Sequence, residues 1–147
     1  MTFLSLLVVV HITALVGWSI TTGGLGWRLF RALRAALAPV DTLNRFLAVG
    51  LPVVTILIVT GILLLSTLFH SIDTVPRYVQ FTIGLYVASL ALGLRLVLLQ
   101  RPALQRAVVE RDGPLTRQIT LRMAQVAAAL TLFSLTIFFA VLYTHCV

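Results

Sequence analysis

A histidine near the start of the chain is the residue whose chemistry stands out first. His11 lies within a long apolar run, and Trp18 follows seven positions later. Seven residues make about two turns of an α-helix, so both side chains would lie on one helix face. Ionisable groups inside apolar membrane segments are costly to keep there, which makes His11 a candidate functional residue.

Three roles are open for the His11 imidazole. It can be an axial ligand to haem b, with Trp18 lining the pocket, or a proton carrier or hydrogen-bond donor in a quinone or porphyrin site. It can also form an interhelical hydrogen bond to a serine or threonine, worth roughly 1 kcal/mol in a membrane. A bis-histidine haem would need His70, which is expected about 10 Å nearer the membrane surface, and single-histidine ligation is equally open.

Arg77 and Gln80 open a later apolar segment and complete the candidate cofactor-binding residues. They could hold a propionate or another carboxylate, or they could anchor the helix at the membrane surface. At the same end of the molecule we expect His70, His145 and Cys146, and imidazole with thiolate suits copper or zinc. The candidate metal ligands are therefore His11, His70, His145 and Cys146.

The composition places these residues in a membrane protein. The 147 residues are 60% hydrophobic and 10% charged, with a mean hydropathy of +1.08, whereas soluble domains carry about 25% charged residues. Four apolar segments, at about 3–29, 46–69, 79–99 and 123–143, reach the roughly 20 residues that a spanning helix needs. We predict a single all-α domain, a four-helix transmembrane bundle.

The distribution of arginine predicts how the bundle is oriented. Of the eleven basic residues, all are arginine, and all except Arg77 lie in or beside the first and third connections. The positive-inside rule makes that side cytoplasmic, so both termini are expected in the periplasm of a bacterium, with the protein in its inner membrane. The net charge of +7 is not attributed to nucleic-acid binding, because no soluble basic domain is present. Membrane lipids are the expected partners.

Prolines mark the expected connections, at Pro39, Pro76, Pro102 and Pro114, because proline favours helix ends. The third connection, residues 101–118, is the longest. Its apolar residues recur at helical intervals between arginines, which predicts a short interfacial helix or an extension of the third segment, ending at Asp112-Gly113-Pro114. The single cysteine excludes an internal disulfide.

The chain resembles two related groups of small four-helix bacterial membrane proteins, the membrane-bound, haem-associated protoporphyrinogen oxidase type and the copper-resistance protein D family. The resemblance is carried by His11 and Trp18, by Arg28-Leu29-Phe30, and by GLPVVTILIVTGILLL in the second segment. The first group has a lysine near the start of its third helix, where this chain has Arg77 or Gln80. The first group also has an Asn-Glu-x-Pro element where this chain reads RMAQVAAAL.

These observations predict a bacterial inner-membrane protein that is haem-binding or redox-linked, with His11 as the ligand. One alternative is a non-catalytic accessory subunit of a larger respiratory or photosynthetic complex, whose small residues such as Gly84, Ala88 and Gly93 would contact other subunits or a second copy. Another is copper handling at the periplasmic face. All four acidic residues lie in connections, so hydrolysis and phosphoryl transfer are not expected, and whether the protein is an enzyme is left open.

Overall fold

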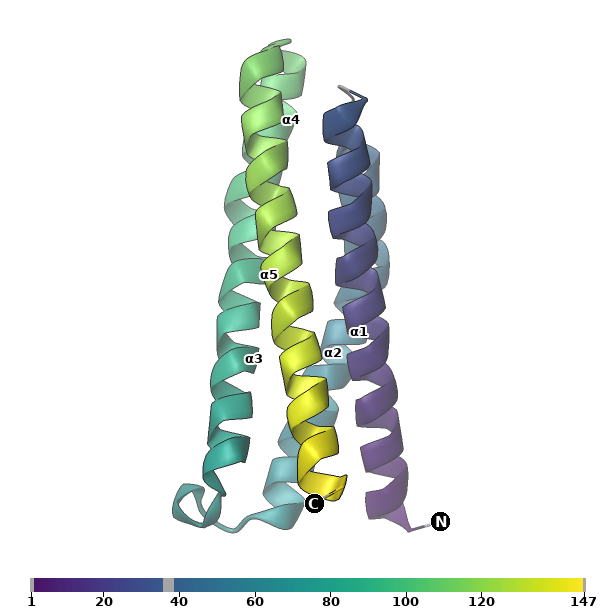
Figure 1. The fold of residues 1–147 in the computed structure, drawn as a ribbon, viewed down its shortest axis with the longest axis vertical. Coiled ribbons are helices and arrows are strands. Elements are labelled where there is room, and N and C mark those ends of the chain that lie inside the picture. Colours follow the sequence, from purple (N-terminus) through teal and green to yellow (C-terminus); the bar gives the residue numbers. More distant parts are fainter. Residues whose placement is uncertain (1, 36–38, 147) are drawn as a thin grey trace.

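Residues 2–35 and 39–146 are described in a computed structural model of the chain, apart from the side chains of Ile72, His145 and Cys146. Helical rods run the length of the molecule (Figure 1). In chain order they are α1 (Phe3–Arg34), α2 (Val40–Leu68), the 3-10 turn η1 (Ile72–Thr74), α3 (Arg77–Arg95), the π-helical turn η2 (Leu96–Gln100), α4 (Arg101–Val109) and α5 (Gly113–Cys146).

The expected all-helical fold is confirmed. Within the described residues, four helices are long and apolar enough to cross a membrane: α1, α2, the rod formed by α3, η2 and α4, and α5. Each begins or ends beyond the apolar segment that predicted it, because arginine-containing sequence at one end continues as helix. A rod of about 33 residues is roughly 50 Å long, compared with about 30 Å of hydrocarbon, so these helices extend out of the membrane.

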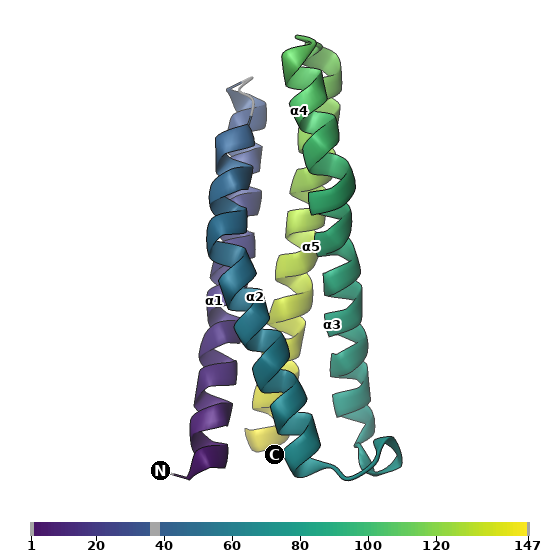
Figure 2. The ribbon, with the colours of Figure 1, turned by 180° about the vertical axis from the view of Figure 1, so that it is seen from behind.

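The core lies along α1 and α5. Helix α1 packs against both α2 and α5, whereas α3 packs mainly against α5. Glycines on α1 bring the two central helices close: a methyl group at Gly26 would lie 3.6 Å from the Cβ of Ala127. Within the described residues, neither α1 nor α2 brings its backbone close to that of α3. Figure 2 shows α2 and α3 running on the same side of the bundle, and only side chains can join α3 to the first hairpin there.

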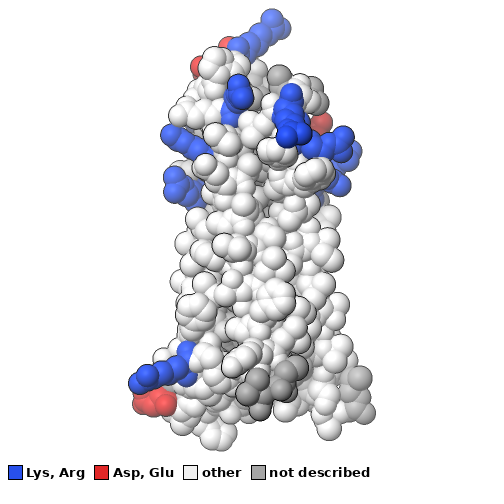
Figure 3. All heavy atoms as spheres, in the orientation of Figure 1, with Lys and Arg blue, Asp and Glu red and all other residues white. Residues whose placement is uncertain are grey.

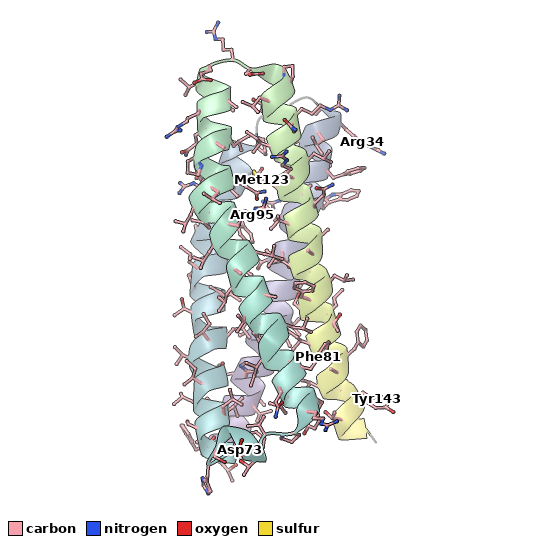
Figure 4. All side chains as sticks on the ribbon, turned by 90° about the vertical axis from the view of Figure 1, so that its left-hand side faces the viewer. Arg34, Asp73, Phe81, Arg95, Met123 and Tyr143 are labelled. Carbon is pink, nitrogen blue, oxygen red and sulfur yellow. The ribbon has the colours of Figure 1, made fainter. Side chains whose placement is uncertain are left out.

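Charge gathers at one end of the bundle, which we call the Arg-rich end. Figure 3 shows blue side chains clustered there and a single blue and red pair at the opposite end. That opposite end carries both termini and the connection between α2 and α3 (Figure 1), and we call it the terminal end. Asp73 and Arg34 mark the two ends in the side-chain view (Figure 4). The long band between them is apolar, as expected for the part of the molecule inside hydrocarbon.

The third connection extends the third spanning segment, one of the two predicted arrangements. The prediction that Pro102 ends a helix was wrong, because α3 passes into α4 through η2 without a break. In η2 the backbone N–H of Arg101 donates to the carbonyl of Leu96, five residues earlier. Proline has no N–H, and its ring collides with the carbonyl four residues before it in a regular helix. The wider π turn accommodates that ring, so the rod continues.

The turn between α4 and α5 closes in a Schellman arrangement. The N–H of Arg111 donates to the carbonyl of Val108 (3.2 Å), and the N–H of Asp112 donates to the carbonyl of Ala107 (3.0 Å). Asp112 then caps α5, because its Oδ1 accepts from the N–H of Leu115 at 3.1 Å. The ending predicted at Asp112-Gly113-Pro114 comes earlier than expected, because α4 ends at Val109 and Gly113 and Pro114 already belong to the first turn of α5. The motif needs a left-handed residue, which glycine usually supplies, but here it is Arg111 with φ 55°.

Replacing Arg111 by glycine should therefore stabilise the protein. Glycine adopts positive φ without the clash of Cβ with the carbonyl oxygen, and the expected gain is about 0.5–1 kcal/mol. The matched control is Arg106→Gly inside α4, which removes the same charge but should cost about 1 kcal/mol. Thermal unfolding of the detergent-solubilised protein measures both. A loss of stability in Arg111→Gly would contradict the assigned turn.

Candidate functional site

His11 meets one residue from α2 and one from α3 inside the apolar band. Its Nδ1 lies 2.7 Å from Oγ1 of Thr60, and its Nε2 lies 3.2 Å from the hydroxyl oxygen of Tyr86. His11 is eight residues from the start of α1, Thr60 eight from the end of α2, and Tyr86 nine from the start of α3. At about 1.5 Å per residue, all three lie roughly 12–14 Å from the terminal end.

The hydrogen bonds of Thr60 assign the protonation of the imidazole. Its hydroxyl has one proton, which it donates to the carbonyl of Ile56 at 2.7 Å, one turn earlier in α2. Oγ1 is then an acceptor for His11, so the ring proton sits on Nδ1. Nε2 keeps its lone pair and accepts from the hydroxyl of Tyr86. The arrangement is a directed chain, from the Tyr86 hydroxyl to the imidazole and from the imidazole to the Thr60 hydroxyl.

Glycines on α2 provide the space for both candidate rings of α1. A methyl group at Gly61 would lie 3.3 Å from Cε1 of His11, and one at Gly50 would lie 3.3 Å from Cζ3 of Trp18. The spacing therefore placed His11 and Trp18 on one face correctly, since both rings contact α2. Trp18 packs against Phe46, with ring centroids 5.9 Å apart, about two helical turns nearer the Arg-rich end than His11.

A small cavity of about 70 Å³ borders the imidazole between α1, α3 and α5. Its polar lining residues are His11, Thr82 and Tyr86, and the remainder are apolar side chains of α1 and α5. Trp18 does not line it. Neither does Gln80, one of the candidate cofactor-binding residues. The Gln80 amide instead donates to the carbonyl of Val75 at 3.0 Å, and Tyr86 and Thr82 are the residues of α3 that line the cavity.

The other predicted site residues lie at the terminal end. Arg77 and His70 are exposed there, and His70 follows the end of α2, whereas the His11 imidazole contacts Thr60 about 12 Å further along that helix. The structure therefore does not bring His70 to His11. The side chains of His145 and Cys146 lie outside the described residues. Among the described ones, no group of three or more His, Cys, Asp or Glu side chains could hold a metal ion, and the copper site stays a prediction.

Thr60, Gly61 and Tyr86 are the site residues that the sequence analysis missed. The sequence holds one signal for them, because each lies about as far from a helix end as His11 does, and those ends were expected on one side of the membrane. A hydroxyl and a glycine at that depth can accept and admit an imidazole from a neighbouring helix. Which helices are neighbours was the missing information.

Comparisons with known proteins add no further assignment. No family model, no curated protein and no solved structure matches this chain. The resemblance to the oxidase type and to the copper-resistance family therefore stays a prediction.

Removing the Thr60 hydroxyl should allow the His11 ring to adopt both neutral tautomers. Thr60→Val keeps the shape but leaves Nδ1–H without its acceptor, so we expect a mixture of the two neutral tautomers and a loss of about 0.5–2 kcal/mol of stability. The ¹⁵N shifts of the His11 ring report the tautomer. The control is Thr55→Val on the same helix, whose hydroxyl bonds only to the Leu51 carbonyl. An unchanged ring spectrum in Thr60→Val would refute the assignment.

Proposed function

We propose that this chain is a bacterial inner-membrane protein with a redox-linked role, and that Nε2 of His11 is the atom that meets its ligand. The arginine distribution supports the membrane assignment, with the Arg-rich end in the cytoplasm and both termini in the periplasm. The hydrogen-bond chain through Thr60 supports the role of His11. It leaves a basic nitrogen in the apolar band, next to a cavity and a phenol.

The pair formed by His11 and Tyr86 suits the oxygen atoms of a quinone-type carrier. When the bond between them opens, Nε2 can accept a hydrogen bond from a quinol hydroxyl, or the Tyr86 hydroxyl can donate one to a quinone carbonyl. Because both groups lie in the outer half of the apolar band, a lipid-soluble carrier can approach them without crossing water. The cavity of about 70 Å³ is small beside the roughly 300–1,000 Å³ of ligand pockets. Only the polar edge of such a ring would enter.

Haem b is the more demanding ligand for the same nitrogen. The donor atom fits, because a metal-bound histidine usually donates its other ring N–H to a fixed partner, as His11 does to Thr60. The enclosed space does not fit, because a porphyrin is far larger than the cavity and the Tyr86 hydroxyl already lies 3.2 Å from Nε2. Haem ligation in this arrangement would require the third rod to move away from His11.

Ligand binding should depend on His11 and not on the other described histidine. We expect His11→Ala to weaken binding of a short-chain quinone about five- to tenfold, through loss of one hydrogen bond in a dry site, and His70→Ala to leave it unchanged. Quenching of tryptophan fluorescence measures binding. A Soret band in protein purified from membranes, lost in His11→Ala, would assign haem as the ligand instead. Absence of both signals from the unmodified protein would remove the proposal.

An accessory subunit is the second candidate, and the exposure of α3 favours it. Ser89 is the single side chain described as buried in this helix, and Gly84 is exposed, with no atom within 4 Å of where its Cβ would be. Small residues on a free helix face permit close packing against another membrane helix. The occupant would be a subunit of a larger complex or a second copy of the chain.

Enlarging this face should separate the protein from such a partner. Gly84→Leu creates no clash within the chain, so the monomer should stay as stable as before while a larger assembly is lost. Gly24→Leu on α1 is the matched control, because a Cβ there also meets nothing within 4 Å. Native electrophoresis in mild detergent measures the assembly. Migration of the unmodified protein as a single chain would exclude this candidate.

A further inference from the structure

One arginine differs from all the others described in the chain. Arg101 is half-buried, whereas every other arginine is exposed. It follows the π turn η2, at the point where α4 contacts α2 near the Arg-rich end. This place is separate from the cavity at His11, and the inference drawn from it does not depend on the proposed redox role.

The Arg101 guanidinium is held in place but incompletely bonded. Its Nη2 donates to Oδ1 of Asn44 on α2 at 2.9 Å. Its Nε is buried, and no hydrogen-bond partner for it exists among the described residues. The preceding residue, Gln100, is 8% exposed and its Oε1 is also buried without a partner in that part of the chain. Buried polar groups are hydrogen-bonded in almost all proteins, so two adjacent unpaired groups mark a place where a further polar partner can bind.

No carboxylate among the described residues neutralises Arg101. Asn44, its one described partner, is neutral, and the acidic residues at the same end of the bundle, Asp41, Glu110 and Asp112, make no hydrogen bond to it. Withdrawing part of a cation from water without an anion beside it is unfavourable, and a bound anion offsets that cost. The π turn matters here because it adds a residue to the helix turn and so sets the direction in which residues 100 and 101 face.

The depth of Arg101 matches that of lipid phosphate. It lies 24 residues beyond the start of α3, and Asn44 lies 24 residues before the end of α2. Both are therefore roughly 36 Å from the terminal end, past about 30 Å of hydrocarbon and within the 40–45 Å that includes the headgroups. A phosphate at this level can take the Nε–H and a remaining Nη–H of the guanidinium together.

We propose that Arg101, positioned by Asn44, binds a phosphate-bearing anion at the junction of α2 and α4. An anionic phospholipid headgroup and free phosphate share this chemistry. Gln100 contributes an amide that can bond to a hydroxyl or a water on the same group. Basic pockets between spanning helices are known to hold anionic headgroups in general. This one is defined by a half-buried arginine whose Nε is buried, unlike the exposed arginines around it.

The test compares two arginines that differ in burial. The full chain in mild detergent is titrated with phosphatidylglycerol, phosphatidylcholine or inorganic phosphate, and binding is followed by native mass spectrometry and by thermal unfolding. We expect Arg101→Gln to weaken phosphatidylglycerol binding about ten- to a hundredfold, as expected for charge-assisted bonds. Arg106→Gln removes an exposed arginine of α4 and should weaken it less than about fivefold. Equal effects of the two variants would overturn the proposal.

A second variant keeps the charge and tests the Nε atom. Arg101→Lys retains a cation but lacks the Nε–H and the planar fork, so we expect at least about fivefold weaker binding. Binding equal to that of the unmodified protein would overturn the proposal, because charge alone would then be enough. If Arg101→Gln fails to fold, Arg101→Lys still tests whether Arg101 binds the anion. Saturation by phosphatidylglycerol at lower concentration than by inorganic phosphate assigns the lipid as the source, and the reverse order assigns free phosphate. No saturable binding of either overturns the proposal.

Discussion

The hydrogen bonds of one imidazole in the apolar band link three helices of this bundle. His11 has two ring nitrogens, and apolar surroundings offer neither of them a partner, so other residues of the chain must supply both. Thr60 supplies an acceptor from α2, and Tyr86 supplies a donor from α3. Gly61 is affected too, since a Cβ at this position would lie only 3.3 Å from Cε1 of the imidazole and would crowd the ring. One polar side chain thus constrains three helices.

The contact to Tyr86 has a particular importance because of how the third rod packs. Helix α3 lies against α5 and, within the described residues, has no close backbone approach to α1 or α2. The hydrogen bond between Tyr86 and His11 joins it to the first hairpin in the half nearer the terminal end. At the Arg-rich end the bond from Arg101 to Asn44 joins the same two parts of the molecule. Between these two hydrogen bonds, apolar packing against α5 holds the rod formed by α3, η2 and α4.

Both contacts, His11 to Tyr86 and Arg101 to Asn44, are hydrogen bonds between helices. Each leaves some hydrogen-bonding capacity unused. At His11 the unused capacity is that of the Tyr86 hydroxyl oxygen, which donates its proton to Nε2 at 3.2 Å beside a cavity and can still accept a hydrogen bond. At Arg101 it is an N–H buried without a partner in the described part of the chain. Interhelical bonds in membranes contribute only about 0.6–2 kcal/mol each. A ligand that offers a better partner can therefore compete with either contact.

The sequence by itself determined the class of fold, because it contains four apolar segments long enough to span a membrane and too few charged residues for a soluble domain. It also determined that His11 and Trp18 share a helix face and that the arginines gather at one end. It could not show that Pro102 lies inside a continuous rod, because a π turn is a local rearrangement of hydrogen bonds with no sequence signal of its own. The candidate site, too, was determined by the sequence only in part. His11 stood out as a lone ionisable group, whereas Thr60, Gly61 and Tyr86 look like ordinary helix residues. Only the packing of the helices decided that these three meet His11, because hydrogen-bond partners across a bundle are chosen by which helices are neighbours and at which depth.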